Sequence, residues 1–229
     1  MITLPAAAVV ILSTIQIAAT GFKVSDSPQN IGPPVNTEYN DYSPTLSPDG
    51  SWMIFNSDRG GRYQNLYVSH LKNGKWTKPR ALNSVNSPYN DESPFLSRDG
   101  NTLIFSSDRD GSIEMPKNEK NQVRVSFDLY WSKKTNGNWS KPEPIPGVVN
   151  TQYHEKSPSL SADGKNLYYN MWPFNDISRV ILVKAEFQNG KFINPNKLPS
   201  PFNQGYRDFG LIPAEDLGGF FFSSNRPEN

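Results

Sequence analysis

The sequence predicts an all-β fold: a β-propeller built of four-stranded antiparallel blades, about three complete and a fourth partial, in an incomplete or truncated ring. The first observation is a unit that recurs four times, starting at Tyr39, Tyr89, Tyr153 and Tyr206. The second is that each unit has turn signals between short apolar and aromatic runs, which is typical of short strands. The third is the composition, in which 20 Pro, 16 Gly and 12% aromatic residues accompany only 35% hydrophobic residues. Four such strands in a unit of roughly fifty residues predict a propeller blade.

Residues 1–21 differ from the rest of the chain and are predicted to be a signal peptide. No charged side chain occurs from Ile2 to Ala19, which is the one long apolar stretch in the sequence. Small residues follow it, and they offer a cleavage site after Gly21. The first residues carry no Lys or Arg, so an uncleaved membrane anchor and a misassigned start codon stay open as alternatives.

The repeated units divide the remainder of the chain. Residues 22–38 are expected to be a linker and the tail strand of a preceding or closing blade. The predicted blades are 39–88, 89–152 with an insertion at 110–125, 153–205, and a partial blade at 206–229. An acid follows the first tyrosine of each unit by two positions: Asp41, Asp91, Glu155 and Asp208. Because such positions keep their chemistry in every unit, the repeat indicates one structural plan used four times.

The first unit shows how the strands of a blade are assigned. Ser47-Pro48-Asp49-Gly50 is predicted to be a turn between strands at 44–46 and 52–55, because Pro fixes φ, Asp bonds its own backbone and Gly tolerates a positive φ. The third strand is expected at 64–69, and its counterpart in the second unit at 127–132. Asn73-Gly74 predicts a hairpin, and Pro79 suits a fourth, edge strand at 75–82.

The composition excludes several classes of chemistry. With 23 Lys+Arg against 22 Asp+Glu, the net charge of +1 gives no overall attraction to nucleic acid, and none is expected as a partner. The absence of cysteine excludes disulfides, thiolate zinc sites and cysteine nucleophiles. The two histidines, His70 and His154, have no metal-ligand spacing. No metal and no cofactor is therefore predicted.

The motifs carry a family resemblance. The run N-D-x-S-P-x-L-S-x-D-G-x-x-x-x-F-x-S-D-R, followed by L-Y-x-S and N-G-x-W, resembles the WD40-like repeat of TolB-type β-propellers over residues 30–226. The third unit departs from it at Met171-Trp172-Pro173, and the fourth keeps Ser224-Asn225-Arg226 but has Leu217 in place of the turn glycine. The resemblance implies an exported bacterial protein of the periplasm or outer membrane. It also implies a role in binding an envelope or peptidoglycan-associated protein.

The candidate binding residues are charged groups that recur at the ends of the predicted strands: Asp41, Asp58, Arg59, Asp91, Asp108 and Arg109. Adjacent Asp and Arg can present both charges to a partner. The alternative is structural: the aspartate after each serine caps a turn, and the arginine pairs with a carboxylate of the next blade. The acids that start the inner strands are expected to bond backbone amides between blades.

Other conspicuous side chains have simpler explanations. Trp76, Trp139 and Phe192 recur at one strand position, which favours packing between blades over a ligand platform. His154 stands beside Glu155, but its counterparts in the other units are not histidines, so no catalytic role is expected. The insertion at 110–125 is expected to be a solvated loop, with a partner-specific loop as the alternative.

The predicted function is that of a non-catalytic, exported scaffold that binds a protein or another envelope component. No G-x-S-x-G nucleophile elbow and no P-loop is present. Contact with a membrane is expected only through residues 1–21, if they are not cleaved. The alternative is a fragment of a propeller-containing hydrolase of the serine peptidase type, or of a polysaccharide lyase, whose catalytic part is absent. An open, adhesive sheet edge is expected at 220–224.

Overall fold

The computed structural model describes residues 30–115, 117, 124–173 and 176–227. The predicted signal peptide at 1–21 lies outside these residues. Within the described part of the chain, no helix has both the length and the apolar character needed to cross a membrane.

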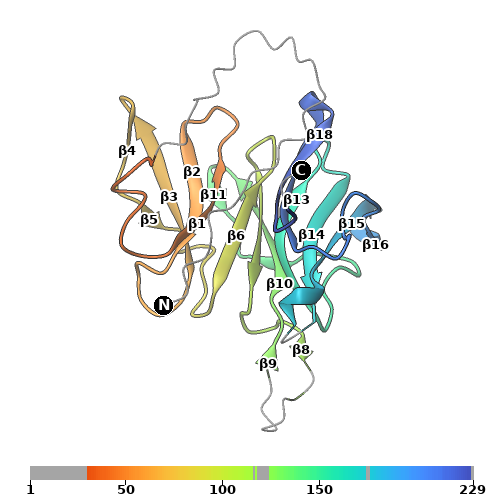
Figure 1. The fold of residues 1–229 in the computed structure, drawn as a ribbon. Coiled ribbons are helices and arrows are strands. Elements are labelled where there is room, and N and C mark those ends of the chain that lie inside the picture. The colour runs from red at the N-terminus through yellow and green to blue at the C-terminus, as the bar shows by residue number, and fades with distance from the viewer. Residues whose placement is uncertain (1–29, 116, 118–123, 174–175, 228–229) are drawn as a thin grey trace.

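The fold is all-β and forms a partial β-propeller (Figure 1). The first sheet contains β1 (Asp41–Leu46), β2 (Trp52–Ser57), β3 (Asn65–Lys72), β4 (Lys75–Trp76) and β5 (Arg80–Ala81). The second contains β6 (Asp91–Leu96), β7 (Thr102–Ser107), β10 (Asp128–Thr135), β11 (Asn138–Trp139) and β12 (Glu143–Pro144). The third contains β13 (His154–Leu160), β14 (Asn166–Trp172), β15 (Ile181–Gln188) and β16 (Lys191–Lys197). The last is a hairpin of β17 (Asp208–Ala214) and β18 (Gly219–Ser224).

The turns form where the sequence places them. Asn73 and Gly74 both have positive φ, 50° and 75°, which is the conformation of a type I′ hairpin turn. The Ser47–Gly50 turn is held by the backbone bond from Gly50 N to Ser47 O and by the Asp49 carboxylate, which accepts from the Ser51 amide. The Asp49 carboxylate also accepts from the Ser47 hydroxyl at 2.6 Å, and this bond, followed by those from Ser51, lowers the pKa of Asp49 to about 2.

The outer strand of the first blade differs from its prediction. The expected strand at 75–82 is two short strands, β4 and β5, that pair with different parts of β3. The break spans residues 77–79, because Pro79 has no amide hydrogen to donate to the ladder.

The insertion in the second blade is also more ordered than a plain loop. Its described residues form a small hairpin of β8 (Glu114–Met115) and β9 (Arg124–Val125). The hairpin is tied to the blade through Asp128, whose carboxylate accepts from the Ile113 amide at 2.9 Å.

Apolar side chains fill the spaces between neighbouring sheets. The largest cluster joins Ile104 and Leu129 of the second sheet to Leu167, Val183 and Phe192 of the third. A second cluster joins the first and second sheets, and Trp139 packs against it. Trp139 and Phe192 thus pack between blades, as predicted. Trp76 instead packs on the face of the first blade that is turned away from the second blade. Val35 of the segment before β1 packs with Phe55 and Tyr67 on that face.

The innermost strands β1, β6, β13 and β17 follow one another side by side around the interior of the partial ring. Each contains a register shift against the second strand of its blade. The shift coincides with a residue of positive φ: Ser43, Ser93, Ser157 and Gly210. This bulge therefore recurs in every described blade and shapes the interior wall.

Candidate functional site

The predicted binding residues of the first two blades form two equivalent clusters. Arg59 donates to Asp41 at 2.6 Å, and Arg109 donates to Asp91 at 2.5 Å. Each arginine also lies over two aromatic rings of its own blade, Phe55 and Tyr67 or Phe105 and Tyr130, at 4.9–5.4 Å. Both arginines reach back to carbonyl groups in the segment before their blade, among them those of Val35 and Val85. The cluster thus attaches each blade to the segment that enters it.

The remaining two candidates cap the strand ends. Asp58 accepts from the backbone and side-chain amides of Asn40 at 2.9 and 2.6 Å. Asp108 makes the same two bonds with Asn90 at 2.8 and 2.9 Å. The charged groups of all six candidates are therefore engaged inside the blades, and their contact with a partner stays a prediction.

One structural expectation is corrected. The arginines do not pair with a carboxylate of the next blade; the partner acid belongs to the same blade. The antiparallel register places Asp41 opposite Ser57, so Arg59, two residues further on, folds back over it. The acids do bond amides of the inter-blade segment, as expected, because Asp91 accepts from the Ser87 amide at 2.6 Å. Burial opposes ionisation of Asp41, but hydrogen bonds from Ser57, Arg59 and Thr37 outweigh it and lower its pKa.

The third blade lacks this ion pair. Met171-Trp172-Pro173 stands where the other blades have Ser-Asp-Arg or Ser-Asn-Arg, and Arg226 of the fourth blade pairs with Asp208 at 2.8 Å. Glu155 is fully buried like Asp91 and Asp208, and its hydrogen-bond donors are the amide and hydroxyl of Thr151. Burial raises the pKa of Glu155 to about 8. It is thus mainly protonated at neutral pH.

The His154 side chain is bonded to the backbone and packed among aromatic rings. Its Nδ1 accepts from the Phe127 amide at 3.1 Å, and its ring packs against Phe127 and Trp172. Burial, and secondarily the charge of Lys156, lowers the pKa of His154 to about 4. The imidazole is therefore neutral at physiological pH and acts as an acceptor toward the backbone.

The candidate functional site is a cavity of about 540 Å³ on the interior of the ring, which we call the inner cavity. All four innermost strands contribute to it, through Ser43–Leu46, Ser93–Leu96, Ser157–Pro158 and Gly210–Ile212. The Ser-Pro bulges place proline rings and small side chains along the wall. Leu46 and Ile212 are about half exposed, 55% and 47%, and leave apolar surface accessible there.

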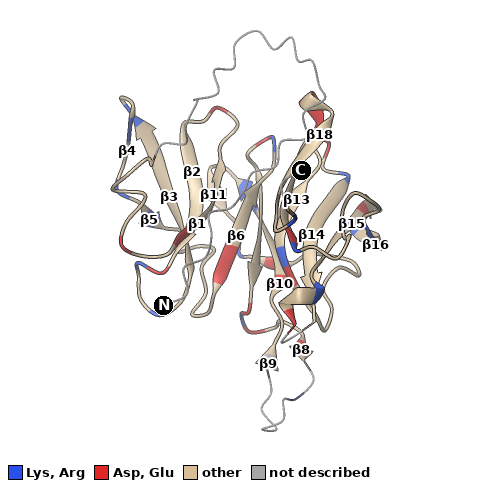
Figure 2. Cartoon of the chain, viewed as in Figure 1, with Lys and Arg blue, Asp and Glu red and all other residues tan. Residues whose placement is uncertain are grey.

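The chemistry of the inner cavity favours binding. None of the described residues that line it is an acid, a base or a histidine, so its serines have no neighbouring base on the wall. Figure 2 shows acidic and basic residues mixed over strand ends and turns. The sequence contained one signal for this wall that our interpretation missed: Ser-Pro recurs in three units, and Gly210 replaces the serine in the fourth.

These features define the class: the chain is a β-propeller protein with a TolB-like fold. A protein from Agrobacterium tumefaciens assigned as TolB is similar with a TM-score of 0.56 at 16% identity, covering 84% of this chain and 61% of that one. TolB from Acinetobacter baumannii aligns with a TM-score of 0.39 at 16% identity, over 76% of this chain and 46% of that one. A puromycin-hydrolysing peptidase of Mycobacterium tuberculosis aligns with a TM-score of 0.48 at 13% identity, over 84% and 38%.

The likeness to the Agrobacterium protein is one of fold, because the identity is low. The chain spans less than two thirds of the length of these solved structures. No protein-family model and no curated protein sequence matches it.

Proposed function

We propose that this chain is a non-catalytic propeller scaffold that binds a protein partner in the bacterial cell envelope, after export to the periplasm. The observation that carries the proposal is the inner cavity, which offers apolar side chains and backbone but no acid–base pair among its described residues. An extended segment of a partner protein suits such a wall, because its apolar side chains can be buried without leaving a charge unpaired. The TolB-like fold supports the envelope assignment as an analogy.

Site-specific crosslinking tests the binding role. A photo-crosslinking amino acid replaces Leu46 or Ile212, which line the inner cavity, and Leu71 of β3 serves as the control because it is also exposed but lies elsewhere. We expect both cavity positions to capture one and the same envelope protein in cells, and the control position not to capture it. Equal capture from all three positions would contradict the proposal.

A turnover assay tests the non-catalytic character. Purified protein is expected to leave model peptides and glycans intact over a long incubation. Turnover that disappears on a single point substitution would identify an enzyme instead.

Export is tested by fusing residues 1–21 to a reporter enzyme that is active only outside the cytoplasm. We expect activity from this fusion and none from a matched fusion in which Val9 and Val10 are replaced by Asp, because charge in the apolar run blocks export. An inactive wild-type fusion would overturn the periplasmic assignment.

A further inference from the structure

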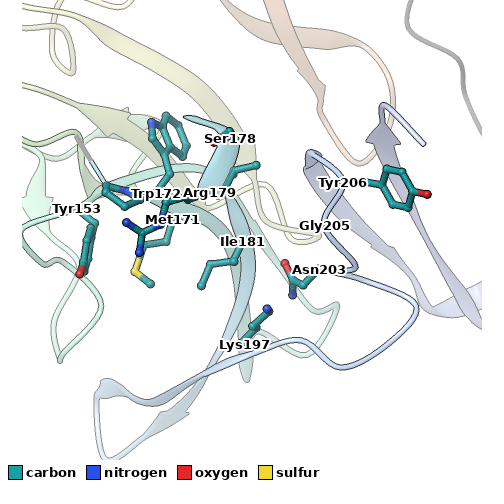
Figure 3. Close-up of a pocket in the computed structure, with 12 residues that line it drawn as sticks. Tyr153, Met171, Trp172, Ser178, Arg179, Ile181, Lys197, Asn203, Gly205 and Tyr206 are labelled. Carbon is teal, nitrogen blue, oxygen red and sulfur yellow. The ribbon is translucent and has the colours of Figure 1, made fainter. Parts of the chain in front are cut away.

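A second cavity lies at one end of the third blade, bordered by the segment that leads into the fourth, and we call it the junction cavity (Figure 3). It has a volume of about 380 Å³ and is separate from the inner cavity in its lining. Its walls come from the end of β14, the short 3-10 helix η1 (Ile177–Arg179), the start of β15 and the segment that enters the fourth blade.

The junction cavity lies where the third unit departs from the repeat. In the first two blades, the last residue of the second strand is a buried serine that faces a polar residue of the third strand: Ser57 faces Asn65, and Ser107 faces Asp128. At the same register position in the third blade, Met171 faces Ile181. The polar cluster is thus replaced by an apolar floor.

Two basic side chains, Arg179 and Lys197, line the junction cavity together with Met171 and Ile181. Arg179 ends η1, Lys197 ends β16, and both side chains line the junction cavity. In the view of Figure 3, Ile181 lies between them. No ion pair between described residues involves either cation, and no acid is among the described residues of the lining. The nearest acid along the chain, Asp176, is bonded to the amide and hydroxyl of Ser178.

Aromatic side chains complete the walls. Tyr153 lines the junction cavity beside Met171 and is 43% exposed; Trp172 also belongs to the lining, with its indole packed against His154 and Phe209. Flat aromatic faces next to an apolar floor suit a planar or ring-shaped body, while a guanidinium binds carboxylate or phosphate oxygens through two parallel hydrogen bonds.

We propose that the junction cavity binds a small organic oxyanion, a carboxylate or a phosphate carried on a flat apolar body. Arg179 and Lys197 hold the oxyanion, and Met171, Ile181 and Tyr153 bury the body. This site does not depend on the protein partner proposed above, because its lining is distinct.

Calorimetric titration of the full chain with simple probes tests the proposal. The probes are 3-phenylpropionate and phenyl phosphate, with neutral 3-phenylpropionamide as the control ligand. We expect at least one of the two anions to bind. The anion that binds more tightly shows whether the site favours a carboxylate or a phosphate. Binding of neither anion, or equal binding of the neutral amide, would overturn the proposal.

Two variants locate the binding. Arg179→Gln and Lys197→Gln are each expected to weaken binding of the preferred anion about tenfold or more, since each removes a charged hydrogen bond worth roughly that factor. Lys191→Gln is the matched control, because Lys191 is exposed on the same strand as Lys197 but does not line the cavity. Unchanged affinity in both Arg179→Gln and Lys197→Gln would show that the anion binds elsewhere.

Discussion

At the scale of single residues, the recurring Asp–Arg pair explains why the same charged residues return in each unit. Asp91 is fully buried, and the side chain of Arg109 is only 12% exposed, so each charge depends on the other. The pair Arg98–Asp216 has the opposite character, because its side chains are 60% and 77% exposed. The two pairs therefore differ in what they contribute to stability.

We predict that Arg109→Met destabilises the protein by about 3 kcal/mol, because it leaves a buried carboxylate without its partner. Arg98→Met is the matched control and is expected to change the free energy of unfolding by less than about 1 kcal/mol. Urea denaturation of both variants measures the difference. Similar effects of the two substitutions would contradict the structural role of the buried pair.

Glu155 makes stability depend on pH. Its pKa is raised to about 8 in the folded protein, so the native state holds a proton that the unfolded chain releases near pH 4.5. The contribution of Glu155 to the free energy of unfolding is therefore fully present below about pH 4.5 and is lost as the pH rises toward 8.

Glu155→Gln is expected to remove this part of the pH dependence, because an amide stays neutral and can still accept from Thr151. Melting temperatures at pH 5 and pH 8.5 test it: the gain from the substitution should appear only at the higher pH. An equal effect at both values would contradict the assignment.

At the scale of elements, the blades are held to one another by close backbone contacts as well as by apolar packing. Gly147 forms a bridge to Phe192 of β16, and a Cβ added to it would stand 1.9 Å from the Phe192 carbonyl oxygen. Its φ of +126° is also one that other residues avoid. The connection between the second and third blades thus requires glycine here.

Gly147→Ala is accordingly expected to cost more than about 2 kcal/mol of stability, through strain and displacement of β16. Gly219→Ala at the start of β18 is the control, because an added Cβ meets nothing within 4 Å there. Chemical denaturation compares the two. A Gly147→Ala protein as stable as the control would show that the bridge does not constrain the fold.

The turns and most of the strands could be predicted from the sequence, but the divided outer strand of the first blade, the β8–β9 hairpin and several contacts between strands could not. Asn73-Gly74 and Ser47–Gly50 carry their conformation in their own chemistry, so the turns could be predicted locally. The repeat predicts the position of a residue within its unit, but it does not predict which unit contains the residue's ion-pair partner. The prediction that Arg59 pairs with a carboxylate of the next blade is therefore wrong. The departure of the third unit at Met171-Trp172-Pro173 is visible in the sequence, but the junction cavity is not, because it depends on how Met171 packs against Ile181 in the folded chain.

At the scale of the whole molecule, β18 is an edge strand of the fourth blade in the part of the chain that the structure describes. The sheet of β17 and β18 has two strands among the described residues, whereas each complete blade continues to a third strand on the far side of its second. On β18, Phe220 and Phe221 are 42% and 47% exposed. An apolar strand edge of this kind is prone to pair with another chain.

We therefore expect the isolated 229-residue chain to self-associate with rising concentration. Phe221→Lys should shift it toward the monomer, since charge on an edge strand opposes pairing. Sedimentation velocity measures this, with Leu71→Lys on β3 as the control for added charge. A wild-type chain that is monomeric at every concentration would contradict the open edge.

Binding of a partner protein in the inner cavity is tested by the affinity of the crosslinked partner for altered cavity walls. Once that partner is purified, its affinity is measured for the wild-type chain, for the double variant Leu46→Asp/Ile212→Asp and for Leu71→Asp. We predict that the double variant weakens binding at least tenfold while Leu71→Asp leaves it unchanged, because only the former places charge on the cavity wall. Unaltered affinity in a folded double variant would contradict the claim.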